Sequence, residues 1–240
     1  MRDHGLDLHR FDLEQEFAKK GCPVCNLLKE YDVKRIDSLL YEFVNDVDVR
    51  TEIRETLGFC NYHAWVMGKV AGEISPELLS SVGGSEGVAM IYLDLVETLT
   101  NRLKSLVDGS LNIRAKMENS VGELCAICTG RSHLEIAYLK NLLYNIADYA
   151  FAEKYAGSDG LCAIHILKTL QLLGYDRNKK ELAMVEITRL EKLSIELQQF
   201  LRKHDYRFSD EGFGKEADSW VRALRKISGE RFAAPIRSRT

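Results

Sequence analysis

The chain has 240 residues, of which 45% are hydrophobic and 29% are charged, and its formal net charge is -3. These values are typical of an ordinary soluble globular protein, long enough for one large core or two coupled halves. The slightly acidic balance argues against bulk nucleic-acid binding. With 3 prolines and 17 glycines, helix breakers are few and helix is favoured.

Helical spacing dominates the first half of the chain. Apolar residues recur every three or four positions from Val24 to Val44, which predicts a long helix with Pro23 in its first turn. Further helices are expected over residues 49–57, 60–72 and 86–107. The mostly polar residues 110–122 form a candidate linker.

The second half is expected to follow the same plan. A long helix is predicted after Cys125, a break at residues 157–160 and a helix over 162–174, followed by an amphipathic helix over about 180–203 and a last helix over 213–227. No segment alternates convincingly as a β-strand does. The most apolar stretches are far too short to span a bilayer, and the charged N-terminus lacks the apolar core of a signal peptide. We therefore expect a cytoplasmic protein.

The two halves resemble each other in sequence. The triplet at residues 39–41 recurs at 142–144, displaced by 103 positions, and Gly58 corresponds to Gly160 with a displacement of 102. We interpret this as a duplicated helical half-domain. The predicted fold is all-α, with two pseudo-symmetric helical repeats over residues 10–109 and 123–205 packed as one body, and with a C-terminal helix and basic tail over 206–240.

All six cysteines fall in two copies of one pattern, C-x-x-C followed at a distance by C-x-x-H. The first copy consists of Cys22, Cys25, Cys60 and His63, and the second of Cys125, Cys128, Cys162 and His165. Three thiols and one imidazole make up the ligand shell of a closed tetrahedral metal site, most often zinc. The sequence thus predicts two metal sites in the chain, with zinc as the expected ion.

The spacing has a physical reason. Two thiols three residues apart can reach one ion from a tight turn or a first helical turn, where free backbone N–H groups and the helix dipole stabilise a thiolate. A cysteine and a histidine three residues apart lie on one helix face. Because three thiolates and an imidazole fill four positions, the shell leaves none for substrate and indicates a structural site.

Other interpretations remain open at this stage. Buried free cysteines would be scattered rather than gathered in motifs. A dithiol redox centre is suggested by the Cys22–Cys25 segment, although no βαβ pattern surrounds it. An iron–sulfur cluster can also use this ligand set. We expect each repeat to close its own site, while a swapped arrangement, in which the C-x-x-C of one half meets the C-x-x-H of the other, also satisfies valence.

Residues outside the motifs give weaker signals. Trp65 and Trp220 are interpreted as core anchors, and His133 as a solvated residue or a second-shell group of a metal site. The basic stretch after Arg222 is interpreted as a flexible tail. No H-E-x-x-H, P-loop, G-x-G-x-x-G or G-x-S-x-G motif occurs. The favoured function is a non-enzymatic, metal-stabilised scaffold or adaptor for a macromolecular partner, and the alternative is a thiolate-based redox, electron-transfer or metal-handling protein.

The motifs together resemble a known family. C-P-x-C at residues 22–25, G-[FL]-C-x-x-H at 58–63, a repeated copy and F-G-x-E-x-D-S-W-x-R-A-L at 213–224 are similar to an uncharacterised family of bacteria and archaea. The resemblance covers roughly residues 10 to 230. Ala126 stands where the first copy has Pro23, which leaves the ligands intact. The family implies no particular activity.

Overall fold

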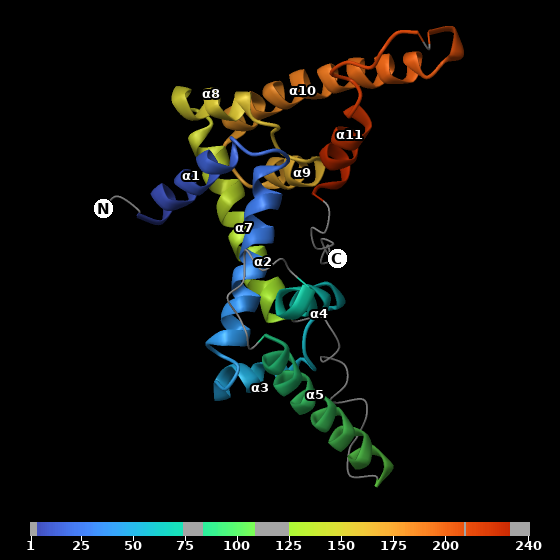
Figure 1. Ribbon diagram of the computed structural model, residues 1–240. Helices are drawn as coiled ribbons and strands as arrows, with labels where there is room; N and C mark the ends of the chain where they lie inside the picture. The colour runs from blue at the N-terminus through green and yellow to red at the C-terminus, as the bar shows by residue number, and fades with distance from the viewer. Residues whose placement is uncertain (1–3, 74–83, 109–124, 209, 231–240) are drawn as a thin grey trace. The chain divides into compact units, whose positions relative to one another are not determined.

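The computed structural model describes residues 4–73, 84–108, 125–208 and 210–230 (Figure 1). Over these residues all regular structure is helical, which confirms the predicted all-α class. The elements are α1 (His4–Glu16), α2 (Pro23–Tyr41), α3 (Val47–Glu55), α4 (Asn61–Gly68), η1 (Lys69–Glu73), α5 (Gly84–Val107), α7 (Ala126–Asn145), α8 (Tyr149–Gly157), α9 (Ala163–Gln171), α10 (Asp176–Lys203), η2 (Tyr206–Phe208) and α11 (Ser219–Ser228). The predicted linker and the residues after 230 lie outside the described ranges.

The chain divides into two compact units. Unit 1 consists of Met1–Lys29 and Leu134–Ala233, and unit 2 consists of Glu30–His133 and Ala234–Thr240. Helices α2 and α7 each contribute residues to both units. The units therefore cut across the repeats expected over 10–109 and 123–205, and that division, as repeats of the sequence, stays a prediction.

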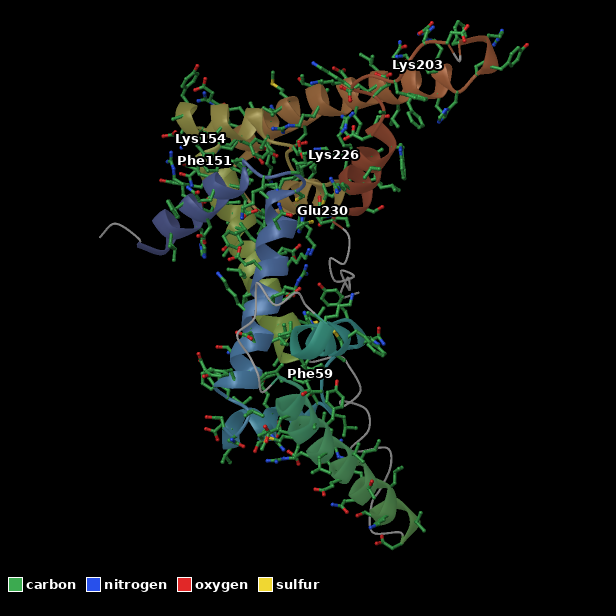
Figure 2. All side chains as sticks on the ribbon, viewed as in Figure 1. Phe59, Phe151, Lys154, Lys203, Lys226 and Glu230 are labelled. Carbon is green, nitrogen blue, oxygen red and sulfur yellow. The ribbon has the colours of Figure 1, made fainter. Side chains whose placement is uncertain are left out.

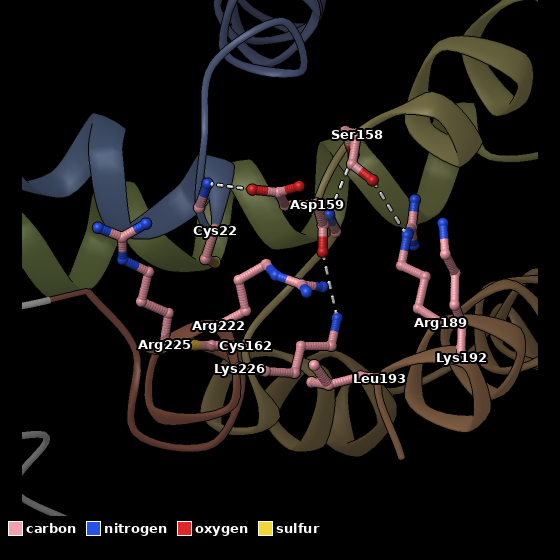
Figure 3. Close-up of a pocket in the computed structure, with 12 residues that line it drawn as sticks. Cys22, Ser158, Asp159, Cys162, Arg189, Lys192, Leu193, Arg222, Arg225 and Lys226 are labelled. Carbon is pink, nitrogen blue, oxygen red and sulfur yellow. Dashed lines mark hydrogen bonds between the residues drawn. The ribbon is translucent and has the colours of Figure 1, made fainter. Parts of the chain in front are cut away.

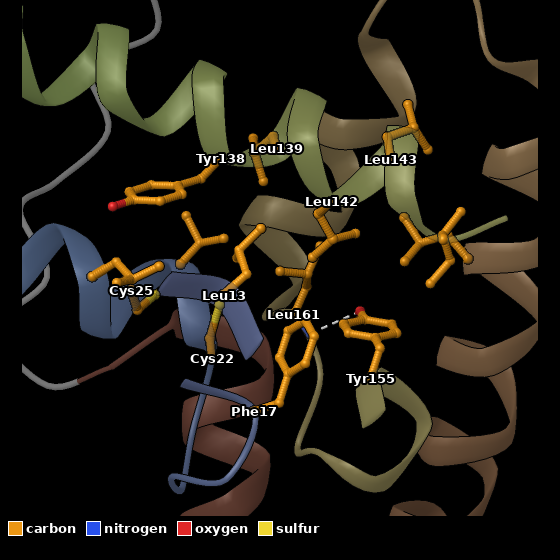
Figure 4. Packing of buried hydrophobic residues seen from close by; sticks show 14 of the residues in the cluster. Leu13, Phe17, Cys22, Cys25, Tyr138, Leu139, Leu142, Leu143, Tyr155 and Leu161 are labelled. Carbon is orange, nitrogen blue, oxygen red and sulfur yellow. Dashed lines mark hydrogen bonds between the residues drawn. The ribbon is translucent and has the colours of Figure 1, made fainter. Parts of the chain in front are cut away.

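Unit 1 has a core built from the start of α2, the later part of α7, and helices α1, α8 and α10 (Figure 4). Aromatic rings are central to it: Phe17 packs edge-to-face on both Phe151 and Tyr155, with ring centroids 5.2 and 5.4 Å apart. Phe151 is buried, whereas Lys154, one turn later on α8, is half-exposed and pairs with Glu14 (Figure 2). The buried residues of α8, Phe151 and Tyr155, stand four positions apart and form the core-facing stripe of an amphipathic helix.

Unit 2 has its own core. The later part of α2 supplies Ile36 and Leu39, which pack with Ile53 of α3, Met67 of α4 and Ile91 of α5. All five side chains are buried. Burial of apolar side chains is the main stabilising contribution, roughly 1.5–3 kcal/mol for each one fully buried.

Two short helices begin in the same way. The side chain of Asp46 accepts a hydrogen bond from the Val49 amide at 2.9 Å to cap α3, and Asp148 accepts one from the Phe151 amide at 3.0 Å to cap α8. The two caps are displaced by 102 positions, as are the starts of α4 and α9. The order of elements thus recurs along the chain, while the pseudo-symmetry of the two halves stays a prediction.

Several expectations need correction. Helices α1 and α8 were not expected, and α11 begins at Ser219 rather than at residue 213, because Gly214 to Asp218 form turns in which the Ser219 amide bonds the Glu216 carbonyl at 2.9 Å. Trp65 and Trp220 are 70% and 51% exposed, so they do not anchor the core. Among the described helices, none is both long enough and apolar enough to cross a membrane.

Candidate metal centres

The eight motif residues come together in two groups of four. Cluster A, in unit 1, consists of Cys22, Cys25, Cys162 and His165, and cluster B, in unit 2, consists of Cys60, His63, Cys125 and Cys128. In each cluster the four donor atoms lie within 4.8 Å of one another. Each cluster can therefore hold one metal ion.

The distances within the clusters suit a tetrahedral shell. Nδ1 of His165 lies 3.2–3.5 Å from the three sulfur atoms of cluster A, and Nδ1 of His63 lies 3.2–3.5 Å from those of cluster B. One sulfur–sulfur separation in each cluster is 3.8 Å, for Cys25 and Cys162, and 3.5 Å, for Cys60 and Cys128. Bonds of about 2.3 Å to sulfur and 2.0 Å to nitrogen place tetrahedral donors about 3.5–3.8 Å apart. All six cysteines are free thiols.

Helix starts position the donors, as the spacing predicts. The first cysteine of every motif stands immediately before a helix, and the second donor follows three residues later in the first turn; these first cysteines are Cys22, Cys60, Cys125 and Cys162. At the starts of α4 and α9 the cysteine itself occupies the N-cap and makes no side-chain capping bond. The N–H groups there remain free to stabilise thiolate charge.

The pairing of the motifs differs from our expectation. Each cluster combines the C-x-x-C of one repeat with the C-x-x-H of the other, so the prediction that each repeat closes its own site is wrong. Helix α2 has 19 residues and is about 28 Å long, and its start and its later part belong to different units. Cys22 and Cys25 lie at its start, in unit 1, while Cys60 packs against the core of unit 2, to which only the later part of α2 contributes.

Each histidine has a buried carboxylate behind it. Nε2 of His63 lies 3.2 Å from Oδ1 of Asp32, and Nε2 of His165 lies 3.0 Å from Oε1 of Glu135. Neither acid stands in a C-x-x-C or C-x-x-H motif. His133, which we considered as a residue supporting a metal ligand, is exposed, whereas Glu135 two positions later is buried and faces His165. The signal in the sequence is positional, since each acid follows the last cysteine of a C-x-x-C by seven residues.

These contacts shift the pKa values of the donors. Hydrogen bonds to neighbouring thiols hold the pKa of Cys60 and that of Cys162 well below the ordinary value, whereas burial raises the pKa of Cys22. Burial lowers the pKa of His63, but bonds to Asp32 and Cys125 outweigh it and raise that pKa to about 11. A bound ion would replace these protons, so metal binding releases protons.

The two clusters differ in exposure. All four donors of cluster A are buried, whereas Cys60 and Cys128 of cluster B are half-buried. The end of α11 covers cluster A: a Cβ atom on Gly229 would lie 3.4 Å from Sγ of Cys25 and 3.7 Å from Sγ of Cys162.

A pocket of about 170 Å³ opens beside cluster A, with Cys22 and Cys162 in its lining (Figure 3). Its other charged lining residues are Asp159 and five cations, which are Arg189, Lys192, Arg222, Arg225 and Lys226. A shell of three thiolates around a divalent ion carries a charge of about -1. The cations around the pocket oppose that charge.

A buried polar network supports the Cys162 loop. The carboxylate of Glu186 accepts a hydrogen bond from the Leu161 amide at 3.1 Å and from the Tyr155 hydroxyl. It also pairs with Lys226 of α11 at 2.5 Å and with Arg189 at 2.9 Å. The network ties α10 and α11 to the residue that precedes Cys162, so it sets the position of one ligand.

Fold and clusters together define a class: an all-helical protein with two groups of three cysteines and one histidine that could each hold a metal ion. Over residues 7–234 the chain matches the family described as a family of unknown function, DUF6062. The chain belongs to this family, which agrees with the resemblance seen in the motifs.

The curated relatives include an uncharacterized 23.9 kDa protein in the xynA 3' region of Caldicellulosiruptor sp. (strain Rt8B.4). It is 25% identical to this chain over 218 residues, which is 90% of this chain and 98% of that protein. The comparison with solved structures finds no match.

Proposed function

We propose that the protein binds two zinc ions, one in each cluster, and that it acts as a non-enzymatic helical scaffold or adaptor for a macromolecular partner. The observation that carries the proposal is the closure of both donor sets, in which three sulfur atoms and one Nδ1 atom lie within 4.8 Å of one another. Four protein donors fill a tetrahedral shell and leave no position for substrate.

Zinc is favoured by the donors. Thiolate and imidazole ligands in a tetrahedral arrangement are typical of zinc. The ligands of a multi-iron cluster bind separate iron atoms, so they stand farther apart than ligands that share one ion. The short separations in clusters A and B therefore support a single ion in each. The free thiols also support our expectation of a reducing compartment such as the cytoplasm.

The ions would join segments that are distant in sequence. Cluster A connects the start of α2 to the start of α9, and cluster B connects the start of α4 to the start of α7. Since such sites are absent from the unfolded chain, metal binding adds to the free energy of folding, on the order of 10 kcal/mol in small zinc peptides. The ions then serve as structural links between helices.

Metal analysis of protein purified without added metal tests the proposal. We expect two zinc ions per chain and six thiols that resist titration until a chelator or denaturant is added. A metal content near zero, with freely titratable thiols in the native state, would count against it. A brown protein containing iron and acid-labile sulfide would support electron transfer instead.

The half-buried sulfur atoms of cluster B support a second function, metal handling or thiolate redox chemistry at that cluster alone. Thiolates react in proportion to their access. Cysteine mapping after brief alkylation of the metal-loaded protein tests this function. It requires rapid modification of Cys60 and Cys128 with release of one ion, while Cys22, Cys25 and Cys162 stay intact; equal resistance of all six thiols would argue for two structural sites.

A further inference from the structure

The carboxylates behind the histidines follow a crossed pattern. Asp32 lies on α2, the helix that supplies Cys25 to cluster A, yet it faces His63 of cluster B. Glu135 lies on α7, the helix that supplies Cys128 to cluster B, yet it faces His165 of cluster A. Each of these two helices thus gives a cysteine to one cluster and a carboxylate to the other.

The contact is specific to the second ring nitrogen. Asp32 and His63 are both fully buried, and Oδ1 and Nε2, which face each other at 3.2 Å, have no other hydrogen-bond partner among the described residues. A polar atom buried without a partner costs about 1–3 kcal/mol. The pair therefore satisfies two groups that would otherwise destabilise the core of unit 2.

Each acid also contacts a cation on the side away from its histidine. The second oxygen of Asp32 lies 3.2 Å from Nε of Arg131 and accepts a hydrogen bond from the Tyr62 hydroxyl at 3.3 Å. Glu135 lies 2.7 Å from Nζ of Lys168. Each carboxylate is thus fixed between its histidine and a cation.

We infer that Asp32 and Glu135 are the positioning residues of the two metal sites, Asp32 for cluster B and Glu135 for cluster A. Each accepts a hydrogen bond from Nε2–H of its histidine. The lone pair on Nδ1 is then available to an ion held between Nδ1 and the three sulfur atoms. The carboxylate also makes the imidazole a stronger ligand. This inference rests on the proposed metal binding.

Alanine and amide variants of both acids test the inference. A chelator competition measures zinc affinity, cobalt substitution reports the ligand field, and alkylation mapping shows which cysteines become reactive. For Asp32→Ala we expect a loss of about 10–100-fold in affinity, an altered cobalt spectrum and new reactivity of Cys60 and Cys128, while cluster A stays protected. For Glu135→Ala we expect the opposite result: cluster A loses affinity and its cysteines become reactive, while cluster B stays protected. Asp32→Asn, which preserves volume, serves if the alanine variant does not fold.

Glu30→Ala is the matched control, because Glu30 lies on α2 two residues before Asp32 but is exposed and pairs with Lys34. It should leave both affinities unchanged. If the unmodified protein binds two ions and neither acid variant alters affinity or the cobalt spectrum, the positioning role is overturned and the proposed function stands. If the unmodified protein binds no ion, the proposed function fails and this inference fails with it.

A second inference comes from α5. Leu93, Val96, Leu103 and Val107 are 61%, 60%, 50% and 88% exposed, and with Thr100 they recur at alternating intervals of three and four residues. The buried Ile91 lies on another face of α5, in the core of unit 2. We call these five residues the α5 stripe. A stripe with this spacing is the seam of a two-helix coiled coil.

Two charges beside the stripe indicate its partner. Glu97 follows Leu93 by four positions, and Lys104 follows Thr100 by four. The two charged residues therefore occupy equivalent positions in successive heptads, and both are exposed. In an antiparallel pair of two α5 helices, Glu97 of one helix lies beside Lys104 of the other, and the pairing occurs twice. We propose that the α5 stripe docks on the α5 stripe of a second copy of this chain.

Sedimentation of the full chain over a concentration series tests the docking. Two heptads form an interface below the roughly 1,200 Å² of stable complexes, so we expect a reversible dimer that forms at high concentration. Leu103→Asp should abolish it, Glu97→Lys and Lys104→Glu should each weaken it, and the double charge reversal should restore it. Leu173→Asp is the control, because Leu173 is 94% exposed outside α5. A monomer at all concentrations, or a dimer that persists in Leu103→Asp, would overturn the proposal.

Discussion

The sulfur atoms of Cys60 and Cys128 lie 3.5 Å apart although 68 positions separate the two residues. Cys60 belongs to the C-x-x-H of the first sequence repeat and Cys128 to the C-x-x-C of the second. This contact makes cluster B a link between α4 and α7, two helices that no local sequence pattern connects. Substitutions can test this crossed pairing of the motifs.

Substitution of one cysteine should disturb both repeats. Cys60→Ser should remove one of the two ions and raise hydrogen exchange in α4 and in the first turn of α7, because both lose the shared ion. Helix α9, which contributes to cluster A, should keep its protection. Exchange mapped by mass spectrometry makes the comparison, with Cys162→Ser as the reciprocal variant that should loosen α9 and the start of α2. A change confined to the first repeat would contradict the crossed pairing.

Gly229 should tolerate no side chain at the end of α11. Its φ of +82° and ψ of -176° lie in a region that is essentially restricted to glycine, so Gly229→Ala should destabilise the fold by about 1–3 kcal/mol. The added Cβ would also lie against Cys25 and Cys162. Urea unfolding measures the loss, and alkylation should find cluster A more reactive.

Gly157→Ala is the control for that variant. Gly157 ends α8 with no atom within 4 Å of an added Cβ. Alanine there should be neutral or slightly stabilising. If Gly157→Ala and Gly229→Ala have the same effect on unfolding, backbone conformation at Gly229 is not the cause.

The buried pair of Lys226 and Glu186 should contribute strongly to stability. Lys226→Met leaves the Glu186 carboxylate with Arg189 as its remaining cation, and removal of one partner from a buried pair costs about 3 kcal/mol. Adding Glu186→Gln should recover part of this loss, since the buried carboxylate that lost its lysine is then replaced by a neutral amide. Lys154→Met breaks a half-exposed pair with Glu14 and should cost less than about 1 kcal/mol. Equal losses in both lysine variants would contradict the argument.

Acid should weaken the segment that leads into α11. A hydrogen bond from Lys203 at 2.7 Å and one from the Gly214 amide at 2.8 Å lower the pKa of Glu216 to about 2. The carboxylate therefore adds stability above its unfolded pKa of about 4.3, and this contribution is lost as pH falls from about 4.3 to 2. Thermal unfolding of Glu216→Gln beside the unmodified protein should show a lower midpoint at pH 7 and converging midpoints near pH 2. A constant difference across this range would rule out the titration.

Local chemistry was predictable from the sequence. Apolar periodicity indicated the helices that bury Ile36 and Leu142, and the three-residue spacing placed each pair of donors in a first helical turn. Such patterns report contacts within one or two turns of a helix. They failed for Trp65 and Trp220, where a helical pattern does not reveal which face meets a core.

The sequence by itself determined the all-α class and the two sets of three cysteines and one histidine. The tertiary structure decided which donors share a cluster: Cys25 at the start of α2 belongs to cluster A, whereas Asp32 later in the same helix faces His63 of cluster B. Helix spacing is set by bonds within a few residues, whereas the meeting of Cys60 with Cys128 depends on the packing of a core assembled from distant segments. Two arrangements satisfied valence equally, and only the packed core distinguished them.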